Sequence, residues 1–496
     1  MDVTGDAVSR PATKDQRMST RTLPVRNPRT GTDDYEIAVA DPDEVELKAA
    51  RLRENQKAWA AKTLEERLDV LRQWVGAFAQ KAAEFGQLEA IDTGGTHTSF
   101  VQGFITMDTI KGVIEDAPGA FERASVHRTS VSMPTVEIRS QFVPYPLVGV
   151  ISPWNAPTML AMFDAVPALA AGSAVLWKPS EVTPRFVPFF FEIVNAVPEL
   201  AKVFDYVLGD GATGQEVIRQ SDLICFTGSV PTGKKIAVAC AEKLIPCYLE
   251  LGGKDPVIVT ETADLERATT SVLNGGVYAT GQVCYSVERI YVHESVYRPF
   301  VDLLVEKARR VHLNYDNPRA GHIGPFTFGK QSETVAAHIA DAKAKGASVL
   351  TGGEVEIHDG GTYMAPTVLT GVDHSMQIMT EETFGPMLPV MPYRDIDEAI
   401  ALANDTVFGL TASVIAGTEE EAIGIGERIN AGSIFLQDTF LMAGKGRTIG
   451  TNSFGFSGVG GGRTGPDSIL RFVRRKGLLV QHGPVADILD AKFEER

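Results

Sequence analysis

The spacing of apolar residues changes repeatedly along this chain. Some segments have the period of a helix, and others are short continuous apolar runs typical of a strand. Between residues 43 and 85 they recur at helical spacing with charged residues between them, which predicts helical structure. Later helices are expected at about 100–117, 157–171, 264–279, 296–311 and 396–404. The polar segment of roughly the first 20 residues lacks such a pattern, and we expect a loose arm there.

Short apolar runs, each followed by small or polar residues and then by a helical pattern, predict the strands of parallel sheets. These runs lie at 148–155, 173–180, 204–209, 222–228, 256–260, 289–294 and 347–353. The rhythm predicts an α/β fold with two units in series. The stretches 135–146 and 472–481 predict strands outside this rhythm, and prolines near the end of the first are typical of an edge ribbon.

Composition narrows the class of protein. The 496 residues are enough for roughly two or three domains with cores of their own. With 44% hydrophobic and 22% charged residues, the chain has the composition of a soluble globular protein. The net charge of −16 argues against a nucleic-acid partner or an anionic membrane surface, because both favour basic patches. No apolar run approaches the roughly 18 residues of a membrane span.

Cysteine usage and the N-terminus bear on the compartment. The four cysteines show no regular spacing and no CxxC pair, so we expect neither a disulfide framework nor a metal site. The N-terminal segment is polar and carries acids, unlike a signal peptide or a transit peptide. The simplest expectation is a reduced, cytoplasmic location.

Two strand ends carry residues that suit ligand binding. In FTGSVPTGKKIA (226–237) two glycines separate a strand from a helix, whose unpaired N–H groups could meet a phosphate. WKPSE (177–181) places a lysine and a glutamate at the end of another strand, the edge that faces ligands in open α/β sheets. Taken alone, each motif is more often an ordinary turn or a solvated loop.

Three further turns hold groups that suit acyl chemistry. Glu250 opens ELGGKDP (250–256) beside flexible backbone and could act as a general base if burial raises its pKa. Asn155 of PWN could donate hydrogen bonds to an oxyanion, and EETFGP (381–386) offers an acid at a strong turn. Taken singly, Glu250 is as well explained by a surface acid, and Asn155 is better explained by an ordinary turn.

Cys284 stands apart from the other cysteines. Cys225, Cys240 and Cys247 lie in apolar or helical runs, as buried structural cysteines do. Cys284 lies in GQVCYS (281–286), after a helical stretch and among small or polar neighbours, where a thiol could face a cleft. A cysteine hydrolase would pair it with a histidine, but the nine histidines are scattered and form no recognisable signature.

Taken together, PWN, KPSE, FTGS, ELGGK, GQxC and E-E-x-FGP resemble, in their order and separations, the aldehyde dehydrogenase superfamily over about residues 22–481. The resemblance implies two Rossmann-like parallel-sheet domains in series plus a small β oligomerisation element. It implies Cys284 as the nucleophile, Glu250 as the base, and Asn155 with the Cys284 backbone N–H as the oxyanion site. An aldehyde would then be oxidised to a carboxylic acid through a thiohemiacetal and a thioester.

The resemblance also implies a coenzyme site built from strand ends and loops. The residues it implies are Ile151, Ser152, Trp154, Lys178, Ser180, Glu181, Gly211, Gly214, Phe226, Ser229, Thr232, Leu251, Gly252, Glu382 and Phe384. Glu181 would lie beside the adenine ribose. A carboxylate there accepts hydrogen bonds from both ribose hydroxyls but repels a 2′-phosphate, so we expect NAD rather than NADP.

The same resemblance divides the chain into domains. Residues 1–127 and 146–250 would form the NAD-binding domain, and 251–466 the catalytic domain. Residues 128–145 and 467–496 would form the oligomerisation element and C-terminal tail. We therefore expect a homodimer or homotetramer that acts on a small-molecule aldehyde.

The substrate pocket is less well defined by the resemblance. The stretch 438–453 is longer than usual and falls at the expected mouth. Candidate apolar lining residues are Phe163, Val283, Tyr285, Phe454 and Phe104. Met107 is better explained as a residue of the hydrophobic core. This apolar set favours an aromatic or medium-chain aldehyde over a charged semialdehyde.

Alternatives remain open. A semialdehyde dehydrogenase, for example one for succinate semialdehyde, could use Lys445 or Arg447 of the long loop to hold a carboxylate. A CoA-acylating relative often lacks the base that Glu250 supplies here. A cofactor-free cysteine hydrolase lacks a histidine partner, and an inactive relative would not need all three catalytic residue types.

Overall fold

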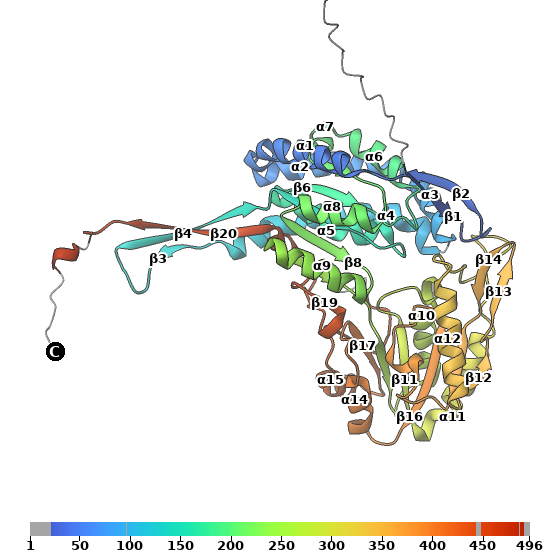
Figure 1. Ribbon diagram of the computed structural model, residues 1–496. Helices are drawn as coiled ribbons and strands as arrows, with labels where there is room; N and C mark the ends of the chain where they lie inside the picture. The colour runs from blue at the N-terminus through green and yellow to red at the C-terminus, as the bar shows by residue number, and fades with distance from the viewer. Residues whose placement is uncertain (1–20, 96, 443–447, 486, 491–496) are drawn as a thin grey trace, which may run out of the picture.

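The computed structural model describes residues 21–95, 97–442, 448–485 and 487–490. Two α/β units adjoin each other, and a long ribbon leads away from the upper one (Figure 1). The expected loose arm at the N-terminus and the candidate residues Lys445 and Arg447 lie outside the described residues. No helix in the described ranges is long and apolar enough to cross a membrane.

The first sheet has six strands within the described residues, and those from β9 to β7 run parallel. Across the sheet they are β19 (Gly458–Val459), β9 (Cys247–Glu250), β8 (Leu223–Thr227), β5 (Leu147–Ile151), β6 (Ala174–Lys178) and β7 (Phe204–Tyr206). Every residue of β5, β6 and β8 is buried, because helices cover both faces of a parallel sheet. β19 falls within the range predicted for the catalytic domain, yet it pairs with β9 of this sheet.

Helices flank this sheet, and their ends follow local capping rules. They are α1 (Pro42–Ala61), α2 (Leu64–Ala79), α3 (Ala82–Thr93), α4 (His97–Ala124), α5 (Pro157–Ala171), α6 (Val187–Asn195), α7 (Pro198–Ala201), α8 (Gly211–Gln220) and α9 (Val230–Lys243). The long helical pattern at 43–85 is thus divided among three helices. Asp41 caps α1, and a capping box between Thr63 and Glu66 starts α2, which explains where the pattern breaks.

The second sheet has seven strands within the described chain and is parallel except at one edge. Its strands in order are β12 (Ser348–Thr351), β15 (Thr367–Thr370), β16 (Met387–Tyr393), β11 (Val287–His293), β10 (Asp255–Val259), β17 (Thr411–Ile415) and β18 (Ser433–Leu436). The edge strand β12 runs antiparallel to β15. Two parallel-sheet units are therefore present in series, and the predicted α/β fold class is confirmed.

Helices and short hairpins complete the second unit and its border. The helices are α10 (Leu265–Val277), α11 (Glu294–Ala308), α12 (Gln331–Ala344), α13 (Gln377–Thr380), α14 (Ile396–Asn404) and α15 (Glu419–Gly426). The hairpins are β1 (Thr22–Arg26) with β2 (Asp33–Ala38), and β13 (Val355–His358) with β14 (Gly361–Met364). Each unit has its own apolar core: one core surrounds the first sheet, and two clusters lie against the second.

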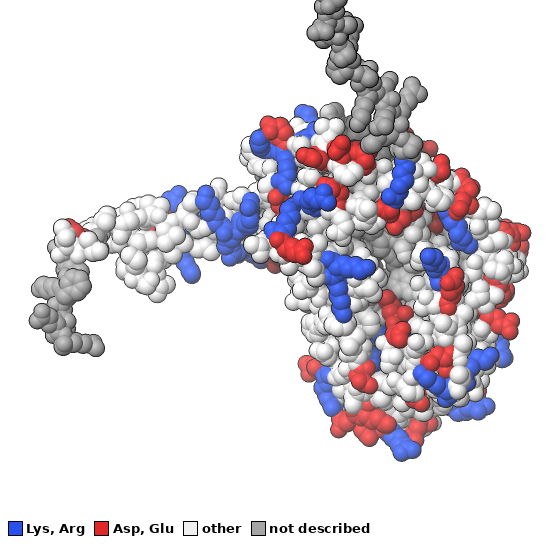
Figure 2. Space-filling view, in the orientation of Figure 1, with Lys and Arg blue, Asp and Glu red and all other residues white. Residues whose placement is uncertain are grey.

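The ribbon joins two segments that are far apart in the sequence. β4 (Val136–Pro144) lies between β3 (His127–Thr129) and β20 (Val473–Gln481), and both pairings are antiparallel. The two strands predicted outside the βαβ rhythm are therefore confirmed, and they pair with each other. Figure 1 shows the ribbon projecting from the body, and Figure 2 shows basic side chains where it leaves the body. β20 supplies exposed Arg474, Arg475 and Lys476 there.

Candidate active site

A cavity of about 420 Å³ is lined by residues of both units, and Cys284, Glu250 and Asn155 are among them. Asn155 follows β5 and Glu250 ends β9, so both lie at the carboxyl edge of the first sheet. Cys284 comes from the other unit, in the loop between η1 (Tyr278–Gly281) and β11. The structure brings together the three residues predicted to be catalytic.

The chain turns sharply just before Cys284. Ala279, Thr280 and Gly281 have φ values of 50°, 62° and 69°, a left-handed run that L side chains rarely adopt. At Gly281 an added Cβ would lie 2.2 Å from the Gly385 carbonyl oxygen. The turn therefore needs glycine at this position both for its backbone angle and for the close approach of a second loop.

Gln282 holds this turn in place and connects it to Asn155. Its Oε1 accepts from the Thr327 N–H (3.0 Å), and its Nε2 donates to Pro325 O (3.4 Å). The Gln282 carbonyl oxygen accepts from Asn155 Nδ2 (3.0 Å). The amide predicted for the oxyanion site is thus already directed toward the loop that carries the thiol.

The Gly-Gly turn after Glu250 lets three loops meet. A Cβ on Gly253 would lie 2.5 Å from the Cys284 carbonyl oxygen, and a Cβ on Gly252 would lie 2.5 Å from Glu382 Oε2. The Gly253 N–H donates to Glu382 Oε1 (3.1 Å). A larger residue at Gly253 would push away the backbone of the loop that carries the thiol, and one at Gly252 would displace the Glu382 carboxylate.

The electrostatic surroundings keep the thiol neutral. Burial raises the pKa of Cys284 to about 12, and the nearby carboxylates Glu382, Asp255 and Glu250 add to the rise. At neutral pH the sulfur therefore carries its proton, and a base must accept that proton when the sulfur attacks an electrophile.

Two acids near the thiol have raised pKa values of their own. Burial raises the pKa of Glu250, although Arg463 and a hydrogen bond from Ser453 Oγ (2.8 Å) favour its ionised form. Burial, followed by the charge of Glu288, raises the pKa of Glu382 to about 8. A carboxylate with a pKa of about 8, as Glu382 has, can exchange protons near neutral pH, and burial raises the pKa of Glu250 in the same direction.

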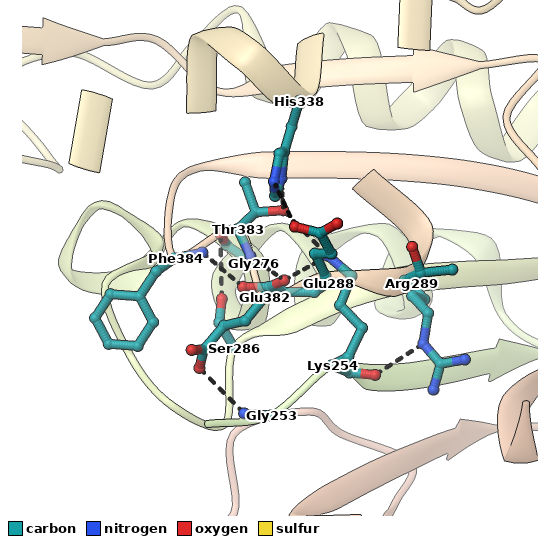
Figure 3. Close-up of polar contacts among 12 residues, drawn as sticks. Gly253, Lys254, Gly276, Ser286, Glu288, Arg289, His338, Glu382, Thr383 and Phe384 are labelled. Atoms are coloured by element: carbon teal, nitrogen blue, oxygen red, sulfur yellow. Dashed lines mark hydrogen bonds and ion pairs between the residues drawn. The ribbon is translucent and has the colours of Figure 1, made fainter. Parts of the chain in front are cut away.

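A buried ion-pair network supports the loops around Cys284 (Figure 3). Glu288 Oε2 accepts from Lys254 Nζ (2.6 Å) and from the Thr383 N–H (2.8 Å), and its Oε1 accepts from the Phe384 N–H (2.8 Å). Lys254 Nζ also donates to Thr383 Oγ1 (3.1 Å). The loop after β9 and the loop before β16 are thereby fastened to the start of β11.

The residues implied for the coenzyme gather at the carboxyl edge of the first sheet. Those at strand ends and in the loops that follow are Ile151, Ser152, Trp154, Lys178, Ser180, Glu181, Phe226, Leu251 and Gly252. Ser152 is fixed by the Trp177 indole N–H, which donates to its Oγ (2.9 Å). Gly211 and Gly214 lie in the first turns of α8, and Ser229 and Thr232 lie at the start of α9.

These residues have the chemistry that a dinucleotide requires. Ser229 is the N-cap of α9 but makes no side-chain capping bond, so first-turn N–H groups remain for a phosphate. At the end of β6, buried Lys178 donates to Glu181 (2.7 Å), which places an ammonium and a carboxylate where a ribose diol could bind. From the second unit, Phe384 packs against Trp154 with ring centroids 5.5 Å apart.

The candidate substrate residues do not all reach the cavity. Phe163, Val283 and Tyr285 line it, but Phe454 is not among its lining residues. The Phe454 N–H donates to Gly409 O (2.9 Å), and its Cβ is packed so closely that a Cβ on Gly409 would lie 2.7 Å from it. Phe104 is 53% exposed and also absent from the lining, whereas Met107 is buried in the core, as expected.

Sequence reasoning missed several residues that shape the site. Ser453 lay within the long loop, and the hydrogen bond it donates to Glu250 has no sequence signal. Lys254 was visible in ELGGK, but its partner Glu288, which is 3% exposed, belongs to none of the motifs named above. Arg463 follows a run of glycines and lines the cavity. Of these residues, only Lys254 carried a sequence signal, namely its position in the ELGGK motif.

Comparisons with known proteins agree with this architecture. The family model described as "Aldehyde dehydrogenase family" matches residues 15–477. A Mycolicibacterium smegmatis protein named "Putative succinate-semialdehyde dehydrogenase (NADP(+))" is 32% identical over 451 residues, which are 90% of this chain and 87% of the relative. Betaine aldehyde dehydrogenase 1 from Rhizobium meliloti is 33% identical over 414 residues, 82% of this chain and 84% of the relative.

Solved structures match along nearly the whole chain. The "Putative Aldehyde Dehydrogenase PutA" from Anabaena variabilis superposes with a TM-score of 0.92 at 43% identity, covering 95% of this chain and 100% of that one. Betaine aldehyde dehydrogenase from Staphylococcus aureus in complex with NAD+ gives a TM-score of 0.89 at 27% identity, covering 95% and 94%. The chain belongs to the aldehyde dehydrogenase family and is an oxidoreductase that acts on aldehydes.

The tight turn before Cys284 generates a prediction about stability and activity. Gly281→Ala introduces a Cβ that collides with the Gly385 carbonyl, so the two loops must separate. We expect a loss of about 1–3 kcal/mol in the free energy of unfolding, measured as a lower Tm, together with slower aldehyde oxidation. Gly76→Ala is the matched control, because Gly76 lies exposed in α2 with nothing within 4 Å of an added Cβ. It should be neutral or stabilising by about 0.5–1 kcal/mol, and equal behaviour of the two variants would contradict the collision.

Proposed function

We propose that the protein oxidises an aldehyde to a carboxylic acid with NAD, using Cys284 as nucleophile, Glu250 as general base and Asn155 as oxyanion donor. The observation that carries the proposal is that a thiol, a buried carboxylate and an amide from separate elements line one cavity. The first unit would bind the coenzyme, the second would present the thiol, and the ribbon would join copies of the chain into a dimer or tetramer. No histidine is among the cavity's described lining residues, which argues against a cysteine hydrolase.

The first covalent step would join the Cys284 sulfur to the aldehyde carbon. The thiol gives up its proton to Glu250, directly or through water, and a C–S bond forms as the carbonyl oxygen becomes an oxyanion. Asn155 Nδ2 turns from Gln282 O to donate to that oxygen, together with the Cys284 N–H. The product of this step is a thiohemiacetal.

Oxidation and hydrolysis would follow. Bound NAD supplies the acceptor for the hydride that leaves the thiohemiacetal carbon, so that a thioester remains on Cys284. Glu250 releases the proton it received from the thiol to solvent, and it then takes a proton from water while the water oxygen attacks the thioester carbon. The C–S bond breaks, the carboxylic acid leaves, and the Cys284 sulfur regains a proton.

The lining of the cavity supports a substrate without a negative charge. Apolar groups such as Phe163, Val283 and Tyr285 border it, and Arg463 is its single cation among the described residues. Arg463 is already in an ion pair with Asp164, whose Oδ2 lies 2.7 Å from the arginine Nη2. A semialdehyde carboxylate would therefore lose its hydration without gaining a free cation from this part of the chain.

A positively charged aldehyde is a second candidate. The described lining includes the acids Asp108, Asp116 and Glu250 against one arginine, so the balance of charge favours a cation. A fourth acid, Glu89, adds less negative charge, because burial raises its pKa to about 8. Relatives named betaine aldehyde dehydrogenase are consistent with this candidate. The aromatic side chains at the cavity serve either substrate, because they bind apolar groups and also attract cations.

The roles of Cys284 and Glu250 can be separated by kinetics. Cys284→Ala should form no NADH from any aldehyde, although NAD should still bind. Glu250→Gln should give a rapid burst of about one NADH per active site and then a steady rate lower by on the order of a hundredfold or more. Rapid mixing with absorbance detection measures both phases. Cys247→Ala, which alters a thiol outside the cavity, should keep turnover; an active Cys284→Ala enzyme would refute the mechanism.

The coenzyme preference depends on Glu181. The negative charge at the end of β6 should make kcat/KM with NAD higher than that with NADP by about tenfold or more. Glu181→Ser should narrow the gap. Glu199→Ser is the control, because Glu199 is a half-buried glutamate of α7 that also pairs with a lysine three residues away. This change should leave the ratio of the two kcat/KM values unaltered. A higher kcat/KM with NADP in the parent enzyme would remove Glu181 from this role.

A panel of aldehydes tests the substrate class. Benzaldehyde and hexanal should have kcat/KM values about tenfold or more above that of succinic semialdehyde, because the carboxylate finds no free cation in the described lining. If betaine aldehyde ranks first, the second candidate holds. If succinic semialdehyde ranks first, Lys445→Met and Arg447→Met should abolish that preference, and the proposal of an uncharged substrate is wrong.

A further inference from the structure

One short segment of the chain contacts Glu250 at two places. Ser453 Oγ donates to Glu250 Oε2 (2.8 Å), and further along Gly458 of β19 is the strand partner of Glu250. The segment then continues to Arg463, which lines the same cavity as Glu250. Residues 453–463 therefore contact Glu250 at its side chain and its backbone and carry a guanidinium to the cavity beside it.

The Arg463 guanidinium is 8% exposed and is held from one helix. Its Nη2 donates to Asp164 Oδ2 (2.7 Å) and to the Leu160 carbonyl oxygen, both of α5. Its Nε–H is buried and has no hydrogen-bond partner within the described residues. Buried donors are almost always paired, so this N–H marks an edge of the guanidinium that Asp164 and Leu160 do not hold.

Charges from several elements act on Glu250. Arg463, and Arg471 of η3 (Ser468–Phe472), lower its pKa, whereas Asp164 of α5 raises it along with burial. Asp164 binds two arginines, because Arg471 Nη1 also donates to its Oδ1 (3.2 Å). Cys284 faces the same cavity as a neutral thiol, since its pKa is raised to about 12.

We propose that Arg463, held by Asp164, is a positioning residue that keeps Glu250 ionised and directed into the cavity for hydrolysis of the thioester. The inference rests on the proposed function of Glu250. Glu250 can accept the proton of water only as a carboxylate, and its burial opposes that charge. A fixed guanidinium offsets this cost, while Asp164 prevents Arg463 from closing a direct ion pair that would remove Glu250 from the reaction.

Opposite charge changes provide the test. Arg463→Met removes the cation, so the pH at which thioester hydrolysis is half-maximal should rise by about one pH unit, with a loss of about tenfold at low pH that disappears at high pH. Asp164→Asn removes the anion, so that pH should fall. Decay of the acyl-enzyme is followed by intact mass after acid quench, from about pH 6 to about pH 9. Arg463→Lys should restore most of the parent profile.

Matched variants separate electrostatics from folding. Arg67→Met removes another buried arginine that donates to a carbonyl of α5, but Arg67 is not at the cavity, so the pH profile should stay unchanged. If Arg463→Met fails to fold, Arg463→Gln, which removes the charge but keeps a hydrogen-bond donor for Asp164, serves instead. Shifts of Arg463→Met and Asp164→Asn in the same direction, or no shift in either, would overturn the inference.

The kinetics of Glu250→Gln distinguish a failure of the Arg463 proposal from a failure of the proposed function. If Glu250→Gln shows the burst and slow steady rate but the Arg463 and Asp164 variants do not shift the pH profile, the proposed function stands and the inference fails. If Glu250→Gln turns over normally, Glu250 is not the base, and the proposed function fails first.

Discussion

The geometry of the site depends on one buried carboxylate, that of Glu288. A carboxylate taken out of water is costly unless every part of its charge is compensated, and here an ammonium and two backbone N–H groups compensate it. Those partners come from the loop after β9 and the loop before β16, and Glu288 itself lies just after Cys284. The cost of burying this charge therefore falls as the loops carrying Glu250, Glu382 and Cys284 come together, which makes their relative placement a condition of folding.

The same residue type takes different states within this region because its partners differ. Glu288 has full compensation, whereas Glu382 receives one backbone N–H bond, from Gly253, and its pKa is raised to about 8. Glu250 accepts one hydrogen bond, from the Ser453 hydroxyl, and the positive charge of Arg463 favours its ionised form. Burial therefore raises the pKa values of Glu382 and Glu250, which have few hydrogen-bond donors, while the fully compensated Glu288 fixes the scaffold.

The sequence predicted the fold well where the signal is local. The apolar runs of β5, β6 and β8 and the pattern of α5 are visible because burial on all sides leaves few polar residues in them. Pairings between distant segments could not be read from local patterns. β19 consists of a Gly-Val pair that becomes a strand only because β9 offers an unpaired edge, and β12 is antiparallel at an edge where the βαβ rhythm no longer applies.

The candidate site shows the same limit at the level of single side chains. Ser453 and Phe454 are neighbours in the chain, but their side chains have different surroundings. The apolar one was chosen from the sequence because a substrate tunnel suggests phenylalanine, yet the serine is the one that reaches Glu250, and the phenylalanine packs against Gly409. Phe163 and Asp164 are likewise neighbours on α5 with different roles. The Phe163 ring lines the cavity, and the Asp164 carboxylate accepts from Arg463. Motifs identify the residues that react, but which neighbour supports them is decided by backbone direction, and that becomes visible only when the strands and helices are in place.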